Sequence, residues 1–322
     1  MKDGIRPLSE QDAQECRSVL AAFRYPAFAD LRAVRKDVVE RISTDQVWAA
    51  KKESDSVALG YWSQGTLGGM VVLRKLDLDT SLFGFPCYSL VHFQVTDDAD
   101  SVTRDRLLKA ALEKLGAHGA VFVSARTDAL DAATMLALQR SGFVYMDTTM
   151  RYAFDLLASA PPPIQSSVVL REAREGDLDS LMEIAATYTE NRFHYDPRIP
   201  RDKADEMYRI WIRNSLRGDA DWTVVAELDG KPVGFTTNKN HPELVTERGG
   251  WVGEMVFSAV SPVARGRDVY TSMIHAGLLH FHGTADLVYL GCLASNVAVQ
   301  RAWQKLGFRV TSSSCSFHHW FA

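Results

Sequence analysis

Apolar positions along the chain follow two periods, and the alternation between them outlines the expected elements. Short apolar or alternating runs bounded by turn residues predict strands, whereas apolar spacings of three and four predict helices. In the first half, strands are expected at residues 5–8, 57–62, 67–73, 88–95, 120–125 and 143–154. Helices are expected to begin near residue 9 and to cover residues 28–50, 101–115 and 131–140.

The second half repeats this order of elements. Strands are expected at residues 168–171, 223–228, 232–237, 251–260, 287–293 and within 308–320, with helices at 177–188, 203–216, 296–306 and a run ending near 282. Gly142 and Gly307 both close a helix and lie 165 positions apart, as do Asp131 and Asn296 at the helix starts. A repeat of this length predicts two copies of one mixed α/β unit.

The stretch between the copies is rich in proline. Pro161, Pro162 and Pro163 stiffen it and exclude a helix or a central strand. We therefore predict a first domain over residues 1–158, a linker over 159–167 and a second domain over 168–322.

Composition and charge exclude several classes of partner. With 46% hydrophobic and 24% charged residues, the chain has the composition of a soluble globular protein. Its net charge of −4 gives no general attraction to nucleic acid or anionic membranes. The four cysteines show no metal-binding spacing, and no apolar run approaches the roughly 18 residues of a membrane span. We expect a cytoplasmic protein without metal, nucleic-acid or membrane partners, for which a homodimer is compatible with the sequence.

A candidate anion site follows the strand at residues 251–260. A short turn carrying Arg265, Gly266 and Arg267 leads from this strand into the helix that ends near residue 282. A strand that feeds a tight turn into a helix offers unpaired N–H groups and the positive end of the helix dipole. The two arginines add charge, so the stretch predicts a phosphate-bearing ligand.

The same stretch resembles a known loop. Val260-x-Pro262-x-x-Arg265-Gly266-x-x-Val269 is similar to the acyl-CoA loop of the GCN5-related N-acetyltransferase (GNAT) superfamily, V-x-P-x-x-R-G-x-G-h-G-x-x-L. The resemblance implies that the turn amides cradle the CoA pyrophosphate and that the preceding strand splays from its neighbour to pair with pantetheine. It makes acetyl-CoA, or another acyl-CoA, the expected co-substrate. The cofactor-binding positions it implies are Val256, Ser258, Val260, Arg265, Gly266, Arg267, Asp268, Val269, Asn296, Ala298 and Trp303.

Two residues depart from the loop pattern. Asp268 and Tyr270 stand where the later glycines would be. A carboxylate roughly 4 Å from a pyrophosphate charge is repelled by about 1 to 4 kcal/mol for effective dielectrics between 80 and 20. Asp268 must therefore turn away, or CoA binding is impaired; alternatively, it is an ordinary N-cap of the following helix.

The candidate base and acid are Glu254 and Tyr270. Glu254 occupies the place of the general base in histone acetyltransferase members of the superfamily, and its apolar neighbours predict partial desolvation that would raise its pKa. The alternative is a surface glutamate. Relatives commonly have a Tyr that acts as general acid seven residues after the position of Asn296. This chain has Trp303 there. Helical spacing favours Trp303 as a core residue. The thiolate could then leave without protonation, since a thiol has a pKa of about 8.5, or Tyr270 or Tyr195 could substitute as the acid.

Backbone groups complete the predicted chemistry. The N–H groups near Ser258 and Val260 are expected to polarise the thioester carbonyl.

The whole chain is similar to two-domain acetyltransferases of the TDP-fucosamine acetyltransferase type, which modify the amino group of a dTDP-4-amino-4,6-dideoxyhexose. Segment 78–84 and segment 191–195 followed by 208–218 carry this likeness, and Asn296 and Ala298 with Gly307–Phe308 are similar to the superfamily's last CoA-contacting helix. It implies tandem GNAT-like domains, each a mixed, mostly antiparallel sheet flanked by helices. Arg192, Phe193 and His194 would then line the acceptor site; alternatively, they form a polar loop after a helix.

The two domains are not expected to be chemically equal. Where the second has its Arg-Gly turn, the first carries Asp97, Asp98 and Asp100, and three carboxylates disfavour phosphate binding. The first domain is therefore predicted to be degenerate and non-catalytic.

Together these features predict an N-acyltransferase that moves an acetyl or related group from acyl-CoA to a primary amine, favouring a 4-amino-dideoxy nucleotide sugar. The alternatives are an amino acid, antibiotic or polyamine acceptor, or a non-catalytic acyl-CoA sensor or scaffold.

Overall fold

The computed structural model describes residues 3–97, 100–166 and 168–321, and the chain forms two compact units. Unit 1 comprises Met1–Ala29, Lys36–Thr148 and Ser313–Ala322, and unit 2 comprises Asp30–Arg35 and Thr149–Ser312. This division differs from the predicted boundary, because the last strand of each half of the sequence runs into the unit formed by the other half. The proline-rich segment contains neither helix nor strand over residues 156–166.

Unit 1 is a mixed, mostly antiparallel sheet in the order β1-β2-β3-β4-β5-β12. Its strands are β1 (Gly4–Pro7), β2 (Val57–Ser63), β3 (Thr66–Lys75), β4 (Cys87–Val95), β5 (Phe122–Asp128) and the end of β12 (Arg309–Trp320). Its helices are η1 (Glu10–Asp12), α1 (Ala13–Ala21), α2 (Lys36–Lys52), α3 (Asp77–Phe83), α4 (Ser101–Ala117) and α5 (Ala132–Arg140). β4 and β5 pair in parallel, and the other neighbours recorded within this sheet are antiparallel.

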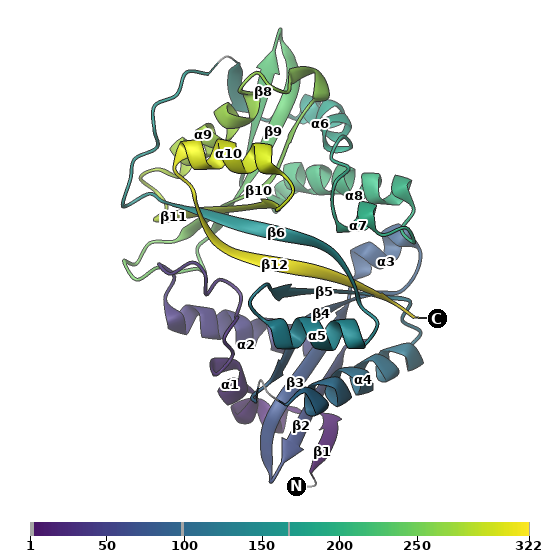
Figure 1. Ribbon diagram of the computed structural model, residues 1–322. Helices are drawn as coiled ribbons and strands as arrows, with labels where there is room; N and C mark the ends of the chain where they lie inside the picture. Colours follow the sequence, from purple (N-terminus) through teal and green to yellow (C-terminus); the bar gives the residue numbers. More distant parts are fainter. Residues whose placement is uncertain (1–2, 98–99, 167, 322) are drawn as a thin grey trace. The chain divides into compact units, whose positions relative to one another are not determined.

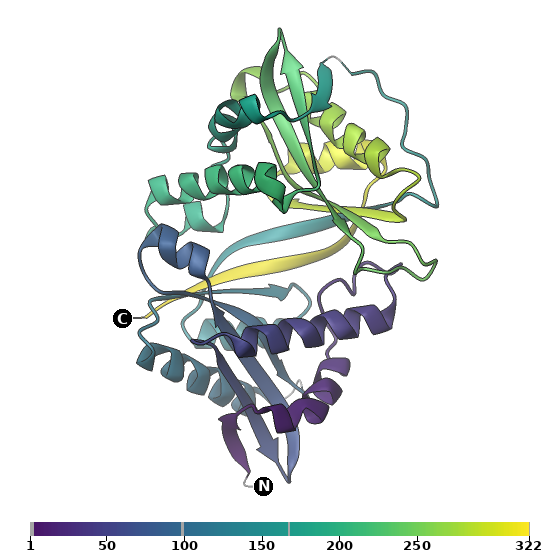
Figure 2. The same ribbon diagram turned by 180° about the vertical axis from the view of Figure 1, so that it is seen from behind.

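Unit 2 repeats this sheet in the order β6-β11-β10-β9-β8-β7. Its strands are the second part of β6 (Val144–Asp155), β7 (Val169–Glu172), β8 (Trp222–Leu228), β9 (Lys231–His241), β10 (Val252–Val260) and β11 (Leu287–Leu293). Its helices are η2 (Glu175–Asp177), α6 (Leu178–Ala185), α7 (Arg192–Tyr195), α8 (Arg201–Asn214), the π-helical turn η3 (Ser215–Asp219), η4 (Pro262–Ala264), α9 (Val269–Phe281) and α10 (Val297–Leu306). Figure 1 shows α9 and α10 on one side of these strands, and the reverse view in Figure 2 brings α6 and α8 to the front.

The internal repeat predicted from residue spacing is confirmed by the pairing of strands. In unit 1, residues 87–90 of β4 pair with 122–125 of β5. In unit 2, residues 252–255 of β10 pair with 287–290 of β11, so every partner lies 165 positions later. Each of β4 and β10 also carries a one-residue bulge, at Val91 and Val256, against the preceding strand. The two units are copies down to strand register.

Most predicted elements are confirmed, with three corrections. The predicted helix over residues 28–50 is wrong before Lys36, since residues 30–35 belong to unit 2, where Val34 bridges Thr246. The helix predicted over residues 177–188 ends at Ala185, and the final segment forms one strand, β12. Local periodicity does not predict where these elements begin and end, because packing against distant segments determines their ends.

The two faces of the unit 2 sheet pack against different helices. Gly253 faces α9 so closely that an added Cβ would lie 2.6 Å from the Phe281 ring, and Gly277 of α9 leaves room for Met255. On the opposite face, Phe257 joins the cluster that contains Tyr208 of α8. Burying a side chain of this size stabilises the fold by about 1.5–3 kcal/mol. Tight packing on both faces therefore fixes the path of β10.

None of the helices in the described part of the chain is both long and apolar enough to span a membrane.

Candidate functional site

β10 and β11 part from each other halfway along their length. Their parallel pairing ends at Met255 and Leu290. Beyond that point β10 stays paired with β9 as far as Val260, and β11 stays paired with β6 as far as Leu293. Each strand keeps its outer partner and loses its inner one, so a wedge-shaped gap opens between them. This is the splay that the sequence resemblance predicted.

The edge of β10 that borders the gap carries backbone hydrogen-bonding groups. The Phe257 N–H donates to the Thr237 Oγ1 of β9 at 3.2 Å, so Phe257 turns its backbone toward β9. Successive residues of a strand turn their backbone groups to opposite sides. Ser258 and Val260 therefore direct theirs toward the gap, as predicted. The bulge at Val256 sets this alternation, because one extra residue reverses the direction of every group that follows.

The turn after β10 ends at the start of a long helix. Gly266 has a φ of 76° and Asp268 a φ of 55°, both in the left-handed region, and α9 begins at Val269. The first N–H groups of a helix have no acceptor within it, so this end combines free donors with the positive end of the dipole. The Arg265 side chain lies along the turn and donates from Nε to the Val260 carbonyl oxygen at 3.3 Å.

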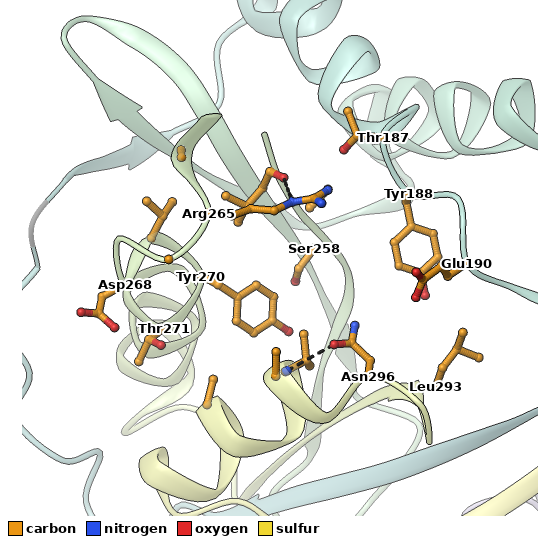
Figure 3. Close-up of a pocket in the computed structure, with 18 of the residues that line it drawn as sticks. Thr187, Tyr188, Glu190, Ser258, Arg265, Asp268, Tyr270, Thr271, Leu293 and Asn296 are labelled. Atoms are coloured by element: carbon orange, nitrogen blue, oxygen red, sulfur yellow. Dashed lines mark hydrogen bonds between the residues drawn. The ribbon is translucent and has the colours of Figure 1, made fainter. Parts of the chain in front are cut away.

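These elements enclose a cavity of about 510 Å³. That volume falls within the usual range for small-molecule sites. The nine predicted site residues on its wall come from β10, the turn, α9 and α10: Ser258, Val260, Arg265, Gly266, Asp268, Val269, Tyr270, Asn296 and Ala298. Figure 3 shows several of them around the open space.

The loop after α6 forms a wall of the cavity that sequence reasoning missed. Residues 187–190 line it together with Leu293 of β11. Figure 3 shows Tyr188 and Glu190 on the side of the cavity away from Asp268. No motif marks this loop, because its role depends on the folding of α6 against β9 and β10.

Asp268 turns away from the cavity, as the prediction required for ligand binding. It is exposed, and Figure 3 shows its carboxylate pointing away from the space between Ser258 and Asn296. It occupies the N-cap position of α9, but its side chain makes no capping hydrogen bond, so the alternative of an ordinary N-cap is not supported. Asn296, by contrast, caps α10 by accepting from the Val299 N–H at 3.3 Å and also faces the cavity.

Tyr270 and Trp303 are joined by a hydrogen bond. The indole Nε1 of Trp303 donates to the Tyr270 hydroxyl oxygen at 3.0 Å. Trp303 is 2% exposed and packs edge-on against Tyr152, so it is a core residue that does not line the cavity. Burial raises the pKa of Tyr270, and the hydrogen bonds from Trp303 and Ser258 act in the opposite direction. The phenol therefore stays protonated at neutral pH.

Glu254 lies outside the cavity wall and is held by a histidine. Its Oε2 is 2.8 Å from Nε2 of His241, whose Nδ1 is 2.8 Å from Oε1 of Glu243. Burial alone would lower the pKa of His241, but the hydrogen bonds to the two carboxylates raise it. Tyr289 approaches His241 Nε2 at 3.4 Å, and burial together with the Glu254 charge raises its pKa. No spacing in the sequence links His241 to Glu254.

The predicted acceptor residues do not line this cavity. Phe193 is 2% exposed, and the His194 side chain is buried with its Nε2 at 2.8 Å from Oδ1 of Asp205. Arg192 lies over the Phe193 ring. The expected loop is the short helix α7, capped by buried Asn191, and this cap turns Phe193 and His194 into the unit. Acceptor contacts through these two residues are therefore not supported by their positions.

Two predicted cofactor residues also lie off the cavity wall. Val256 is the exposed bulge residue of β10, and Arg267 is exposed on the turn.

In unit 1 the corresponding gap is filled by a side chain. Arg104, which is 165 positions before Val269, is 2% exposed. Its guanidinium lies 3.5 Å from the Val95 carbonyl oxygen, 3.4 Å from Thr134 Oγ1 and 5.8 Å from the centre of the Phe93 ring. The three residues 165 positions after these contacts, at 258, 260 and 299, all line the cavity of unit 2. Arg104 therefore occupies the space that is open in unit 2.

The helix start in unit 1 is also unlike that of unit 2. Asp100 caps α4 by accepting from the Thr103 N–H at 2.8 Å, so a carboxylate already satisfies this end. Asp98 of the predicted acidic turn lies outside the described residues. Across residues 3–97, 100–166 and 168–321, no three His, Cys, Asp or Glu side chains are grouped to hold a metal ion.

Comparisons with known proteins agree with this geometry. Residues 179–308, which span the cavity, match the model of the acetyltransferase (GNAT) family. The chain is 24% identical over 205 residues to the spore coat polysaccharide biosynthesis protein SpsD of Bacillus subtilis (strain 168), a match covering 62% of this chain and 66% of that protein, just under two thirds of its length.

Solved structures share the fold over nearly the whole chain. A GCN5-related N-acetyltransferase from Sphaerobacter thermophilus superposes with a TM-score of 0.62 at 16% identity, covering 98% of this chain and 95% of that one. A tandem GNAT protein from the clavulanic acid biosynthesis pathway does so with a TM-score of 0.59 at 15% identity, covering 99% and 98%. Residues 179–308 thus match the acetyltransferase (GNAT) family model, and the whole chain, with its duplicated sheet and parted strands, has the fold of tandem GNAT proteins.

Proposed function

We propose that unit 2 transfers an acetyl or related acyl group from acyl-CoA to a primary amine, and that the favoured acceptor is a 4-amino-dideoxy nucleotide sugar. The observation that carries the proposal is the parting of β10 from β11 beside a 510 Å³ cavity that ends at the turn of Arg265 and Gly266. The likeness to SpsD, a polysaccharide biosynthesis protein, supports a sugar acceptor.

The residues around the cavity fit the parts of an acyl-CoA thioester. The turn and the α9 N-terminus offer N–H donors and a positive dipole end for the pyrophosphate, with Arg265 alongside. The backbone N–H groups of Ser258 and Val260 are directed toward the gap, where they can donate to the carbonyl oxygens of the pantetheine arm. A N–H group on this edge would also stabilise the negative charge that develops on the thioester oxygen.

Glu254 is the proposed base. The amine nitrogen attacks the thioester carbonyl carbon and the C–N bond forms. The C–S bond then breaks with its electron pair staying on sulfur, so CoA leaves as the thiolate. The proton lost by the amine passes to Glu254 directly or through water. His241 holds that carboxylate at 2.8 Å and leads to Glu243, whose side chain is 49% exposed, so a proton can leave toward solvent along this line.

Arg104 supports assigning the reaction to unit 2 alone. A buried guanidinium in the counterpart of the cavity excludes a ligand from that space, so unit 1 is proposed to be non-catalytic.

The test measures acetyl-CoA binding by calorimetry and thiol release with a panel of amines that includes 4-amino-dideoxy nucleotide sugars, amino acids, aminoglycosides and polyamines. Binding with turnover of a nucleotide sugar supports the full proposal, and turnover of another amine corrects the acceptor. Binding without turnover of any amine would indicate a sensor, and absence of binding at millimolar acetyl-CoA would remove the transferase proposal.

Glu254→Gln tests the base. We expect kcat to fall by about 10²-fold or more, since general base catalysis contributes about 10²–10⁴. The Kd of acetyl-CoA should not change, because Glu254 lies off the cavity wall. Glu243→Gln is the matched variant, since it removes the carboxylate charge beside His241 Nδ1 and leaves Glu254 in place. Full activity of Glu254→Gln from pH 6 to 9 would exclude Glu254 as the base.

A further inference from the structure

His241 stands between two carboxylates, one at each ring nitrogen. Its Nε2 is 2.8 Å from Oε2 of Glu254, and its Nδ1 is 2.8 Å from Oε1 of Glu243. A neutral imidazole carries one N–H, whereas a charged ring carries two and can donate to both carboxylates. The two contacts together therefore fit the charged ring.

The surroundings of the ring favour the same form. Burial lowers the pKa of His241, but the hydrogen bonds to Glu254 and Glu243 outweigh burial and raise the pKa above its ordinary value. Tyr289 of β11 also meets the ring, with its hydroxyl 3.4 Å from Nε2. This phenol stays neutral because burial and the Glu254 charge raise its pKa, so it adds no charge beside the imidazole.

The nearby cations Lys239 and Arg151 leave this balance in place. Lys239 is the cross-strand neighbour of Glu254 and is exposed, so water and salt screen its charge. Arg151 of β6 lies 5.2 Å from the centre of the Tyr289 ring, and its guanidinium pairs with Asp30 at 2.7 Å. The carboxylates at 2.8 Å therefore dominate the electrostatic environment of the imidazole.

Glu254 and His241 lie beside the closed end of the gap between β10 and β11. Glu254 is one residue before the point at which the parallel pairing of these strands ends. Gly253 and Met255 face α9, so Glu254 faces the other side of the sheet, where it meets His241. A thioester bound by the turn after β10 would extend its acyl group toward this end of the gap, because β10 runs from here to the turn.

We propose that Glu254 and His241 act as one base and that the pair with a charged ring is its inactive form; this inference rests on the proposed acyl transfer. In the active form the ring is neutral, with its N–H toward Glu243 and the Nε2 lone pair toward Glu254. The lone pair and the carboxylate oxygen repel each other at 2.8 Å, and a proton between them relieves this repulsion. The pair therefore binds a proton more strongly than a carboxylate alone.

The protons balance over one turnover. The N–H bond of the attacking amine breaks, and its proton passes through Oε2 of Glu254 to Nε2 of His241, which forms the charged ring. One proton then leaves for solvent beside Glu243, whose side chain is 49% exposed, and the neutral ring is regenerated. While the ring stays charged, its Nε2–H offsets the charge of Glu254, so the carboxylate cannot act as an efficient base.

The first test follows the ring by NMR and needs no acceptor. His241→Gln identifies the imidazole signal, and its titration midpoint in wild type should lie above about 6.5. Glu254→Gln should lower this midpoint by about one pH unit or more. Glu243→Gln should lower it less, because that side chain is more exposed. A wild-type midpoint at or below about 6.5, or no change in Glu254→Gln, would overturn the pairing.

The second test measures kcat against pH with saturating acetyl-CoA and the most active amine of the panel. Wild-type kcat should rise with pH through the midpoint found for His241. In His241→Gln the acidic limb should move down by at least about one pH unit, since a carboxyl alone titrates near about 4.3. The plateau should fall by about tenfold, because a weaker base remains. The amine titrates alike with every variant, so it does not affect this comparison.

An acidic limb that stays in place in His241→Gln would overturn the role of the ring. Should that variant be unstable, Glu243→Gln takes its place, since it changes an exposed side chain. Its acidic limb should move in the same direction by a smaller amount, and an unmoved limb would overturn the proposal.

This inference and the proposed function fail in different ways. If the wild type transfers acetyl groups and the acidic limb does not depend on His241, the shared base is lost and acyl transfer stands. If the wild type transfers nothing although the ring titrates as expected, the proposed function falls, and the charged pair then has no catalytic role.

Discussion

The charge of Asp268 offers a direct test of how the turn meets its ligand. Asp268 replaces a glycine of the family loop, it is exposed, and its carboxylate points away from the cavity. Asp268→Asn removes the charge and keeps the side-chain shape, and asparagine tolerates the left-handed backbone at φ 55° as well as aspartate does. The substitution therefore isolates the electrostatic effect of one carboxylate on a bound pyrophosphate.

The orientation of the carboxylate decides the magnitude. At roughly 4 Å and an effective dielectric of 20, repulsion of about 4 kcal/mol would correspond to nearly a thousandfold in affinity. A solvated carboxylate directed away from the ligand interacts as in water, which limits the repulsion to about 1 kcal/mol. We therefore expect Asp268→Asn to bind acetyl-CoA about two- to fivefold more tightly.

Calorimetry with acetyl-CoA at about 20 mM and about 500 mM salt measures this effect. The gain in acetyl-CoA affinity should be present at low salt and largely disappear at high salt, because salt screens the interaction between exposed charges. Asp268→Gly is the matched variant, since it also removes the left-handed strain and should raise Tm as well. A gain of a hundredfold or more would show that the carboxylate faces the pyrophosphate, and unchanged or weaker binding would refute the electrostatic reasoning.

Three further outcomes follow from the contacts described. Arg265→Ala should weaken acetyl-CoA binding about tenfold in calorimetry, because it removes one charge-assisted contact at the turn; unchanged affinity would place the pyrophosphate elsewhere. Hydrogen bonds from Arg6 lower the pKa of Asp12 to about 2, so this carboxylate stabilises the fold above pH about 4, and that stability, no more than about 2 kcal/mol, is lost as the pH falls toward 2. Chemical denaturation from pH 5 to 2 should show this loss in wild type and not in Asp12→Asn. The same dependence of the unfolding free energy on pH in both proteins would contradict the prediction. Gly253→Ala should destabilise the protein by about 1–3 kcal/mol in urea titrations, since its Cβ would overlap the Phe281 ring, and a neutral effect would show that α9 can shift.

The comparison of the two units shows that a gap open in unit 2 is filled in unit 1. Both keep the parallel pairing that ends after four residues and the bulge that precedes it. Among the positions at which they differ is one on the helix that borders the gap, which is Val269 in unit 2 and Arg104 in unit 1. A valine leaves the gap open, whereas an arginine reaches the Val95 carbonyl oxygen and Thr134 and fills it. The two units thus share the scaffold, but only in unit 2 is this space open.

The order of elements and the position of the ligand turn were predictable from the sequence. Strands such as β11 and helices such as α10 were placed to within a residue, because apolar periodicity and capping residues are local signals. The hairpin turns at Gln64–Gly65 and Asp229–Gly230 are likewise local features, because both residues of each turn have the positive φ angles that glycine-containing hairpin turns favour. The duplication was visible because both copies keep the same spacing.

Tertiary structure alone decided which residues meet. The pairing of β6 with β11 and of β12 with β5 joins residues between 132 and 198 positions apart, so no local pattern records it. The same holds for the pairs His241–Glu254 and Trp303–Tyr270. A periodic pattern shows which face of an element is buried but not which element covers it. The site therefore depends on two kinds of information: the donors of the turn follow from local sequence, whereas the side chains placed around them follow from packing between distant parts of the chain.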